Sequence, residues 1–207
     1  SHAETHRARI DMQCAGKTPS LSMPASDDTI YCTVVDAEGN AVSFINSLFE
    51  NFGSGVMAPK TGVMFHNRGY SFRLDADHPN VLAPRKRPLH TIIPGLVMRN
   101  GRPVMPFGVM GGHYQSFGQA WMLSNMVDFG MDIQEAQDCA RVFAYHGQVP
   151  IERGVPDATA ARLRDMGHDV FVRAAALGGS QGIWIDQECG VLAAGSDPRK
   201  DGCALAL

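Results

Sequence analysis

Two stretches near residue 30 carry the clearest strand pattern in the chain. Thr29–Asp36 and Ala41–Ser47 are rich in β-branched and aromatic residues, which favour extended structure. Ala37-Glu38-Gly39 connects them, and Gly39 suits the left-handed position of a short hairpin turn. The pattern therefore predicts a β-hairpin over residues 29–47.

The register of this hairpin follows from its turn. If Asp36 pairs with Asn40, every earlier residue pairs with a fixed later one, and Thr29 falls opposite Ser47. Directly opposed residues point to the same face of a sheet, so the two hydroxyls meet at the open end of the hairpin. Two strand-end hydroxyls bonded to water are enough to explain this pair from the pattern alone.

The rest of the chain alternates short strands with helices, joined by loops that glycine and proline mark. This mixture favours the α+β class. The predicted strands are Gly62–His66, His90–Arg99, Pro103–Met110, His168–Arg173, Ser180–Asp186 and Val191–Ala194, and the predicted helices are Gln115–Phe129, Asp132–Val142 and Asp157–Met166.

Helix signals accompany each of the three helical stretches. Asp132 and Glu135 have the spacing of a reciprocal N-terminal cap, and Gly167 suits the end of the third helix. The apolar side of the first helix is expected to hold Phe117, Ala120, Met122, Met126 and Val127.

Composition sets ordinary bounds on the class of protein. A length of 207 residues is enough for one domain with a substantial core. The net charge of -3, without a long basic run, argues against a nucleic-acid surface. Five cysteines without metal-type spacing indicate reduced thiols and a cytoplasmic setting, with a periplasmic one as the alternative. No signal peptide or membrane span is visible, and we expect no membrane partner.

The chain contains an ordered set of motifs that starts at Thr29. They are T-x-x-x-x-V-V-D at residues 29–36, H-P-N and A-P-R-K-R-P within 78–88, G-V-M-G-G at 108–112 and G-S-D-P-R-K-D-G at 195–202. Together they resemble the small subunit of γ-glutamyltransferases (γ-glutamyltranspeptidases). Members of that family are N-terminal-nucleophile hydrolases with an αββα sandwich fold, so this resemblance implies the same fold here.

The resemblance also implies a division of the chain. Residues 1–28 would be the end of a large subunit and a flexible linker, and residues 29–207 the small-subunit catalytic domain. Gly16–Asp28 has the composition of a linker, with two prolines and several serines. In the family, the threonine becomes a new N-terminus when the precursor cuts itself, so Asp28–Thr29 is the expected cleavage site.

Four residues match the catalytic positions of the family. The resemblance makes Thr29 the nucleophile, and its free α-amine, with an ordinary pKa of about 8, would serve as the base. Ser47 stands where the family has a threonine that bonds to the nucleophile. Gly111 and Gly112 match the pair whose amide N–H groups face the developing oxyanion. No cofactor is expected, and the irregular spacing of the histidines predicts no metal site.

The substrate-binding positions depart from the glutathione-cleaving pattern. They are occupied here by Phe49, Asn67, Arg68, Ser71, His90 and Thr91. Phe49 replaces an asparagine, Arg68 a glutamine and Ser71 an acid that reads the substrate ammonium, while the last two replace a serine pair. An arginine recognises carboxylates in a bidentate manner, so γ-glutamyl specificity is in doubt while the nucleophile machinery is kept.

The resemblance therefore implies a processed amidohydrolase or acyltransferase of this family that cleaves γ-glutamyl or similar, glutathione-like amides through an ester on Thr29. Its expected partner is the large subunit of the same precursor, and apolar faces left uncovered would favour self-association. Two alternatives stay open. One is the same chemistry on a non-glutamyl donor, as in oxamate amidohydrolases and glutaryl or cephalosporin acylases; the other is an unprocessed, inactive fragment.

Overall fold

The computed structural model describes residues 1–16, 28–145 and 147–206. The chain divides into two compact units. One comprises the described parts of Ser1–Met23 and Cys139–Leu177, and the other comprises Pro24–Asp138 and Gly178–Leu207, as far as they are described. This division rests on contacts, so the boundary predicted at Thr29, which concerns cleavage, stays a prediction.

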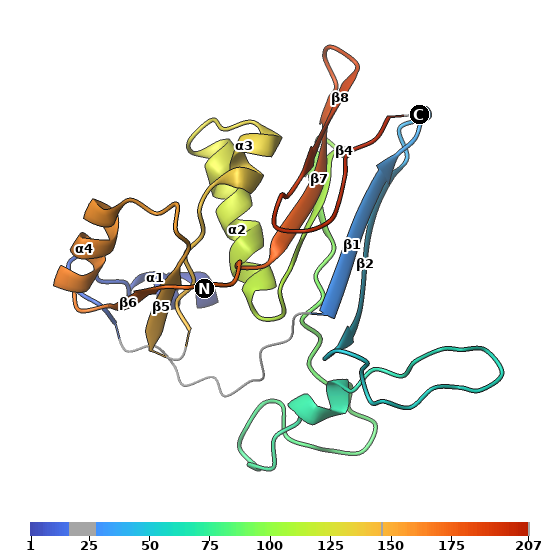
Figure 1. The fold of residues 1–207 in the computed structure, drawn as a ribbon, viewed down its shortest axis with the longest axis horizontal. Coiled ribbons are helices and arrows are strands. Elements are labelled where there is room, and N and C mark those ends of the chain that lie inside the picture. The colour runs from blue at the N-terminus through green and yellow to red at the C-terminus, as the bar shows by residue number, and fades with distance from the viewer. Residues whose placement is uncertain (17–27, 146, 207) are drawn as a thin grey trace. The chain divides into compact units, whose positions relative to one another are not determined.

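The larger unit stacks two layers of strands beside a layer of helices (Figure 1). β1 (Asp28–Val35) and β2 (Ala41–Phe49) form a hairpin. The hairpin packs on an antiparallel sheet of order β3-β4-β7-β8, and α2 and α3 pack on that sheet as well. The bounds are β3 Gly95–Arg99, β4 Arg102–Met110, β7 Gly179–Asp186, β8 Val191–Ser196, α2 Tyr114–Val127 and α3 Ile133–Asp138.

The hairpin has the predicted register. Thr29 pairs with Ser47 and Val35 with Ala41, and Gly39 has the left-handed φ of 82°. One side of the hairpin turns towards the larger sheet, and Thr29 and Tyr31 are buried on that side, while its other residues are half-buried. The other side is apolar but exposed: Ile30, Val34, Val42 and Phe44 are each at least half exposed.

The core of the larger unit lies between the sheet and the helices. Met105 and Phe107 of β4 pack against Met122 of α2 and against Ile133 and Ala136 of α3. All of β4 from Val104 to Met110 is buried, as expected for a strand covered on both faces.

Several predicted elements are shorter or absent. The predicted strand at 62–66 reduces to one bridge between Met57 and Met64, and the strand predicted to begin at His90 begins at Gly95, after Pro94. The helix predicted to reach Val142 ends at Asp138. At that end the side chain of Arg199 donates to the carbonyls of the last two residues, Gln137 and Asp138, and so satisfies two carbonyls that the helix leaves unpaired.

The helix signals themselves are largely confirmed. Asp132 Oδ1 accepts hydrogen bonds from the N–H groups of Gln134 and Glu135, and Glu135 Oε2 accepts one from Asp132 N–H. The apolar side predicted for α2 is partly wrong, because Phe117, Ala120 and Val127 are exposed. The buried positions are Tyr114, Gln115, Gly118, Met122 and Asn125. None of the helices in the described ranges is long and apolar enough to cross a membrane.

The smaller unit contains a βαβ arrangement. β5 (Gln148–Ile151), which the sequence pattern did not predict, pairs in parallel with β6 (Asp169–Val172). α4 (Asp157–Asp165) lies between them in the chain, and a further short helix, α1 (His2–Arg7), belongs to the same unit. Its core is Val149, Ile151, Ala160 and Val170.

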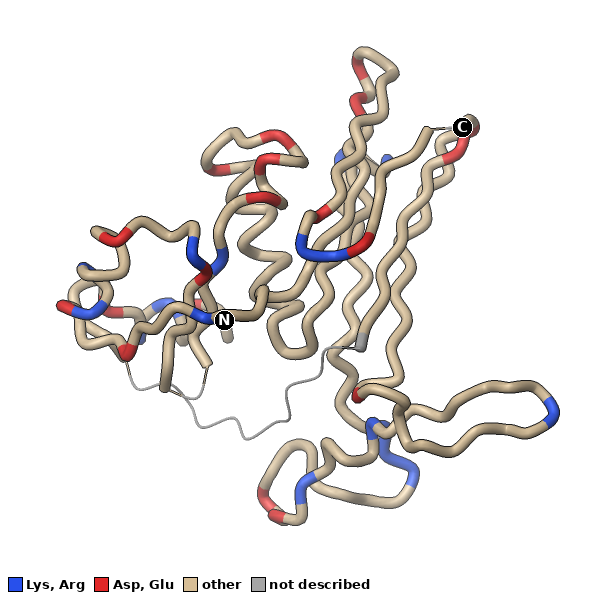
Figure 2. Tube along the Cα trace, viewed as in Figure 1, with Lys and Arg blue, Asp and Glu red and all other residues tan. Residues whose placement is uncertain are grey.

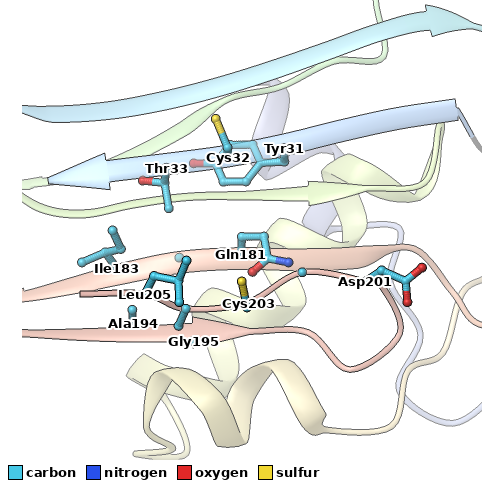
Figure 3. A pocket seen from close by; sticks show the side chains of 13 residues that line it. Tyr31, Cys32, Thr33, Gln181, Ile183, Ala194, Gly195, Asp201, Cys203 and Leu205 are labelled. Carbon is cyan, nitrogen blue, oxygen red and sulfur yellow. The ribbon is translucent and has the colours of Figure 1, made fainter. Parts of the chain in front are cut away.

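A cavity of about 320 Å³ lies between β1 and the strands β7 and β8 of the larger sheet (Figure 3). Thr33 lines it from β1 and Ile183 from β7, and residues 201–205 also line it. Cys32 and Cys203 belong to the lining and, like the other three cysteines, form no disulfide. The cavity does not include Thr29, so the two layers leave unfilled space away from the start of the hairpin.

Candidate active site

The predicted nucleophile lies at the start of β1. Thr29 is only 7% exposed, and its Oγ1 is buried without a hydrogen-bond partner among the described residues. A buried hydroxyl usually finds a partner, so an unpaired one draws attention to this position. β1 begins at Asp28, which means that the bond expected to be cut joins the first two residues of this strand.

The predicted helper lies directly across the hairpin. Ser47 pairs with Thr29, and the register shifts at the next step so that Asp28 pairs with Phe49. Ser47 Oγ accepts a hydrogen bond of 3.0 Å from the N–H of Phe49. The hydroxyls of Thr29 and Ser47 are opposed in register but do not bond to each other in this chain.

The predicted oxyanion pair forms the turn between β4 and α2. Gly111 and Gly112 have φ values of 119° and 57°, which only glycine adopts readily. We call these two residues the oxyanion turn. The ring of Tyr31 on β1 lies against Gly108 of β4, and β1 starts at the end of the layers where β4 leads into α2 (Figure 1). The oxyanion turn and the start of β1 therefore lie at the same end of the larger unit.

Arg68 is the most unusual charged residue of the site. It opens a short 3-10 helix, Arg68–Ser71, and is only 1% exposed. Its Nη1 donates to Thr91 Oγ1 at 3.3 Å and its Nη2 to the carbonyl of Ser47 at 3.4 Å. No acidic side chain pairs with it in the described ranges. Burial lowers the pKa of the guanidinium below its ordinary value, which reflects the cost of holding this charge away from water.

Phe49 covers Arg68 from one side. Its side chain is fully buried, and the Cζ atom of Arg68 lies 5.4 Å from the centre of its ring. A guanidinium over an aromatic face is a favourable contact, but it does not neutralise the charge. Arg68 thus lies against the ring of Phe49 and is tied by one hydrogen bond to Ser47, the residue opposite Thr29.

The remaining predicted substrate-binding residues are partly engaged in hydrogen bonds with the backbone. Ser71 is buried, and its hydroxyl donates to the carbonyl of Arg68 at 2.8 Å. His90 is exposed, with its Nδ1 2.8 Å from the carbonyl of Pro88. The hydroxyl of Thr91 accepts directly from Arg68, whereas the ring of His90 is linked to Arg68 only through the ring of His66, whose Nδ1 accepts from the Arg68 N–H.

Asn67 connects this cluster to an acid that sequence reasoning missed. Its Nδ2 donates to Glu50 Oε2 at 2.5 Å, and its Oδ1 accepts from the N–H of Glu50 at 3.1 Å. Its own N–H donates to the carbonyl of Leu48. Glu50 directly follows Phe49 in the sequence, and that adjacency was the only available signal.

The family model described as gamma-glutamyltranspeptidase matches residues 1–207. The chain belongs to the γ-glutamyltranspeptidase family. The resemblance found in the ordered motifs is therefore confirmed. The predicted fold of the N-terminal-nucleophile hydrolases is confirmed as well, since the mixed strands and helices match γ-glutamyltranspeptidase and cephalosporin acylase structures.

The chain is similar in sequence to two curated proteins and in structure to one solved enzyme, as follows. It is 40% identical to the glutathione hydrolase-like YwrD proenzyme of Bacillus subtilis, over 91% of this chain and 38% of that protein. It is 39% identical to the oxamate amidohydrolase proenzyme of Klebsiella pneumoniae, over 86% of this chain and 35% of that protein. The structure of cephalosporin acylase from Bacillus halodurans matches with a TM-score of 0.87 and 42% identity, over 98% of this chain and 37% of that chain.

The chain thus spans little more than a third of the length of these relatives. Among the described residues, no group of three or more histidine, cysteine or acidic side chains is arranged to hold a metal. Thr29, Ser47, Phe49, Arg68 and Thr91 are brought together by the hairpin and the loop that follows it.

Proposed function

We propose that the protein containing this chain is an N-terminal-threonine amidohydrolase or acyltransferase whose preferred acyl donors carry a carboxylate and no free α-ammonium. The single observation that carries this proposal is the buried guanidinium of Arg68, which has no acidic partner in the described ranges and is tied to the strand opposite Thr29.

The chemistry begins with cleavage of the precursor at Thr29. The Thr29 hydroxyl attacks the carbonyl of Asp28, and the acyl group moves from nitrogen to oxygen, which breaks the carbon–nitrogen bond and frees the α-amine of Thr29. Water then hydrolyses this ester, which releases the Asp28 carboxylate and restores the Thr29 hydroxyl. In the acyl transfer that follows, Oγ1 bonds to the carbonyl carbon of the donor while its proton passes to the α-amine. The carbon–nitrogen bond breaks as the leaving amine takes that proton, and water or another amine resolves the ester.

Arg68 selects the donor through its charge. An unpaired buried charge is costly, and the usual remedy is a hydrogen-bonded ion of opposite sign. Thr91 and the carbonyl of Ser47 use only part of the guanidinium, so a donor carboxylate can take the remaining N–H groups. Bound there, the donor would present its amide to the start of β1.

An α-ammonium on the donor would lack a favourable partner near Arg68. The position of the family's acid is Ser71, whose hydroxyl is engaged with the carbonyl of Arg68. An ammonium placed near Arg68 would be repelled and poorly solvated. The similarity to an oxamate amidohydrolase and a cephalosporin acylase supports the same preference, because oxamate is an amide that bears a carboxylate and no ammonium.

The nucleophile is tested by mass spectrometry of the full-length precursor. Thr29→Ala removes the attacking hydroxyl, so we expect a single uncut chain. Thr29→Ser keeps a hydroxyl and should still split before residue 29. Splitting of Thr29→Ala at that bond would assign the cut to another protease and contradict self-cleavage.

The donor is tested by a paired assay of γ-glutamyl and glutaryl anilides, which differ only in the α-ammonium. We expect the processed enzyme to favour the glutaryl compound at least tenfold in kcat/KM, a difference of about 1.4 kcal/mol. Arg68→Gln keeps hydrogen-bonding capacity without the charge and should lose at least that factor on the glutaryl compound.

Glu50→Gln tests the main alternative, in which the enzyme prefers γ-glutamyl donors because an acid binds the donor ammonium. Asn67 holds the Glu50 carboxylate at the edge of the site, and if that acid read a donor ammonium, the substitution would selectively reduce γ-glutamyl turnover. Equal or better turnover of the γ-glutamyl compound by the unmodified enzyme would overturn the proposed preference.

A further inference from the structure

Residues 195–202, which comprise the end of β8 and the turn after it, enclose the first residues of β7, and we call them the clamp loop. Asp197, at its centre, has no exposed surface. Its Oδ2 accepts hydrogen bonds from the N–H and the hydroxyl of Ser180, at 2.8 Å and 3.0 Å. The backbone adds a third bond, from Asp197 N–H to the carbonyl of Ser180.

Two neighbours of Ser180 are held by the same loop. A Cβ on Gly179 would lie 2.3 Å from Lys200 Cγ, so the stem of Lys200 lies directly against that glycine. A Cβ on Gly202 would lie 2.4 Å from Gln181 Nε2. Three consecutive residues of β7 are therefore enclosed by the clamp loop.

The other oxygen of Asp197 anchors the loop to a helix. Asp197 Oδ1 accepts from the N–H of Arg199 at 2.9 Å and from its Nη1 at 3.1 Å. Arg199 also donates to the carbonyls of Gln137 and Asp138 at the end of α3. The carboxylate thus links β7 to α3 through one well-bonded, buried ion pair.

The segment held in this way supports the oxyanion turn. Gly179 pairs with Met110, the last residue of β4 before the turn. A Cβ on Gly111 would lie 2.8 Å from the Cα of Gly178, and a Cβ on Gly178 would lie 2.3 Å from the carbonyl of Met110. The backbone of Gly178 is in direct contact with that of Met110 and Gly111, so a displacement of residues 178–180 would also displace Gly111.

We propose that Asp197 is a positioning residue for the oxyanion turn: it fixes the start of β7, and through Gly178 it sets where the N–H groups of Gly111 and Gly112 point. This inference rests on the proposed function. Asp197 does not touch the substrate in this role. Its effect is confined to the stage at which charge develops on the acyl oxygen, where a small misplacement of donors is costly.

The first test compares Asp197→Asn with Asp186→Asn in the processed full-length enzyme. Asp186 lies at the opposite end of β7 and accepts hydrogen bonds from Glu188 and Cys189 of its own turn, so it is a matched control. We expect Asp197→Asn to lower kcat about tenfold to a hundredfold with KM changed less than about twofold. Asp186→Asn should keep kcat within about twofold. The donor is whichever anilide the unmodified enzyme turns over best, so a wrong donor class changes the choice of donor but not these ratios.

A second readout is independent of turnover. A boronic acid analogue of the donor forms a tetrahedral adduct with the Thr29 hydroxyl and places an oxygen at the oxyanion position, whereas the carboxylic acid product does not form that adduct. Asp197→Asn should weaken the boronate by the same factor as kcat and leave product affinity within about twofold. Ser180→Ala, which removes only the hydroxyl donor, should show a smaller loss in the same direction and serves if Asp197→Asn does not fold. A rise in KM with unchanged kcat, equal losses in the control, or equal weakening of boronate and product would overturn the assignment.

Discussion

Phe49 holds a backbone conformation that a large side chain rarely adopts. Its φ of 83° lies in the left-handed region, which costs on the order of 1–3 kcal/mol for such a residue. The residue is held there by its full burial and by the bond from its N–H to Ser47. Asparagine tolerates the same backbone well, so the asparagine expected in glutathione-cleaving members and the phenylalanine found here suit one chain path. The difference between them lies in what covers Arg68.

Ser47 can be tested at the same scale. Ser47→Ala removes the hydroxyl opposite Thr29 and should lower kcat roughly a hundredfold, or about 3 kcal/mol, if that hydroxyl assists the nucleophile. Ser43→Ala is the matched control, because Ser43 also faces inward on β2 but bonds to Tyr31 instead. Unchanged kinetics in processed Ser47→Ala enzyme would remove Ser47 from the catalytic group.

Individual elements differ in how well the sequence predicts them. The hairpin register followed from a short turn and a period of two, both of which are local. The end of α3 contacts Arg199, which is about sixty positions away in the sequence, and the buried side of α2 is set by neighbours that periodicity does not reveal. β5 was missed because it has four residues and contains Pro150.

The candidate site, too, depends on contacts between residues that are distant in the sequence. The family motifs indicated which residues to consider, but charge alone favoured a surface position for Arg68, and only the fold buries it beneath Phe49. Asp197 was visible in the sequence as part of a motif, but its bond to Ser180 joins the residue after β8 to a residue of β7 and has no local signal.

Packing between the hairpin and the sheet offers a prediction for these elements. A Cβ on Gly108 would lie 2.4 Å from the ring of Tyr31, so Gly108→Ala must displace that ring and the hairpin with it. We expect a loss of about 1–3 kcal/mol of stability together with reduced turnover. Gly69→Ala is the control for stability, since a Cβ there meets nothing within 4 Å. Chemical denaturation monitored by fluorescence measures the stability of both variants, and equal stability would contradict the packing argument.

At the scale of the whole molecule, the outer side of the hairpin is not covered by the described residues of its own unit, and Ile30, Val34, Val42 and Phe44 are exposed there. Residues 29–35 and 41–49 contain no charged side chain, and Figure 2 shows both strands free of charge along their length, with acidic residues at the tip. An exposed apolar patch of this kind usually marks an interface. The rest of the proposed precursor is the expected cover, since the chain spans 38% of a relative's length.

The isolated 207-residue chain should therefore self-associate and lack full activity. Phe44→Glu places a charge in the patch and should shift the isolated chain towards the monomer in sedimentation experiments. Leu74→Glu changes an equally apolar but separate exposed residue and should leave self-association as it is. Full turnover by the lone chain, or equal effects of the two substitutions, would argue against this account.

The uncovered side of the hairpin also imposes an order of events. Exposed hairpins of separate molecules associate at a rate that grows with the square of their concentration. A covering segment on the same polypeptide docks at a rate that does not depend on concentration. If the precursor supplies that cover, covering has to precede the cut at Thr29, because an early cut would turn the intramolecular step into a slower encounter between two molecules. If β1 can cleave before Thr29 only after the rest of the precursor has covered the hairpin, docking would always precede cleavage without a further regulatory protein.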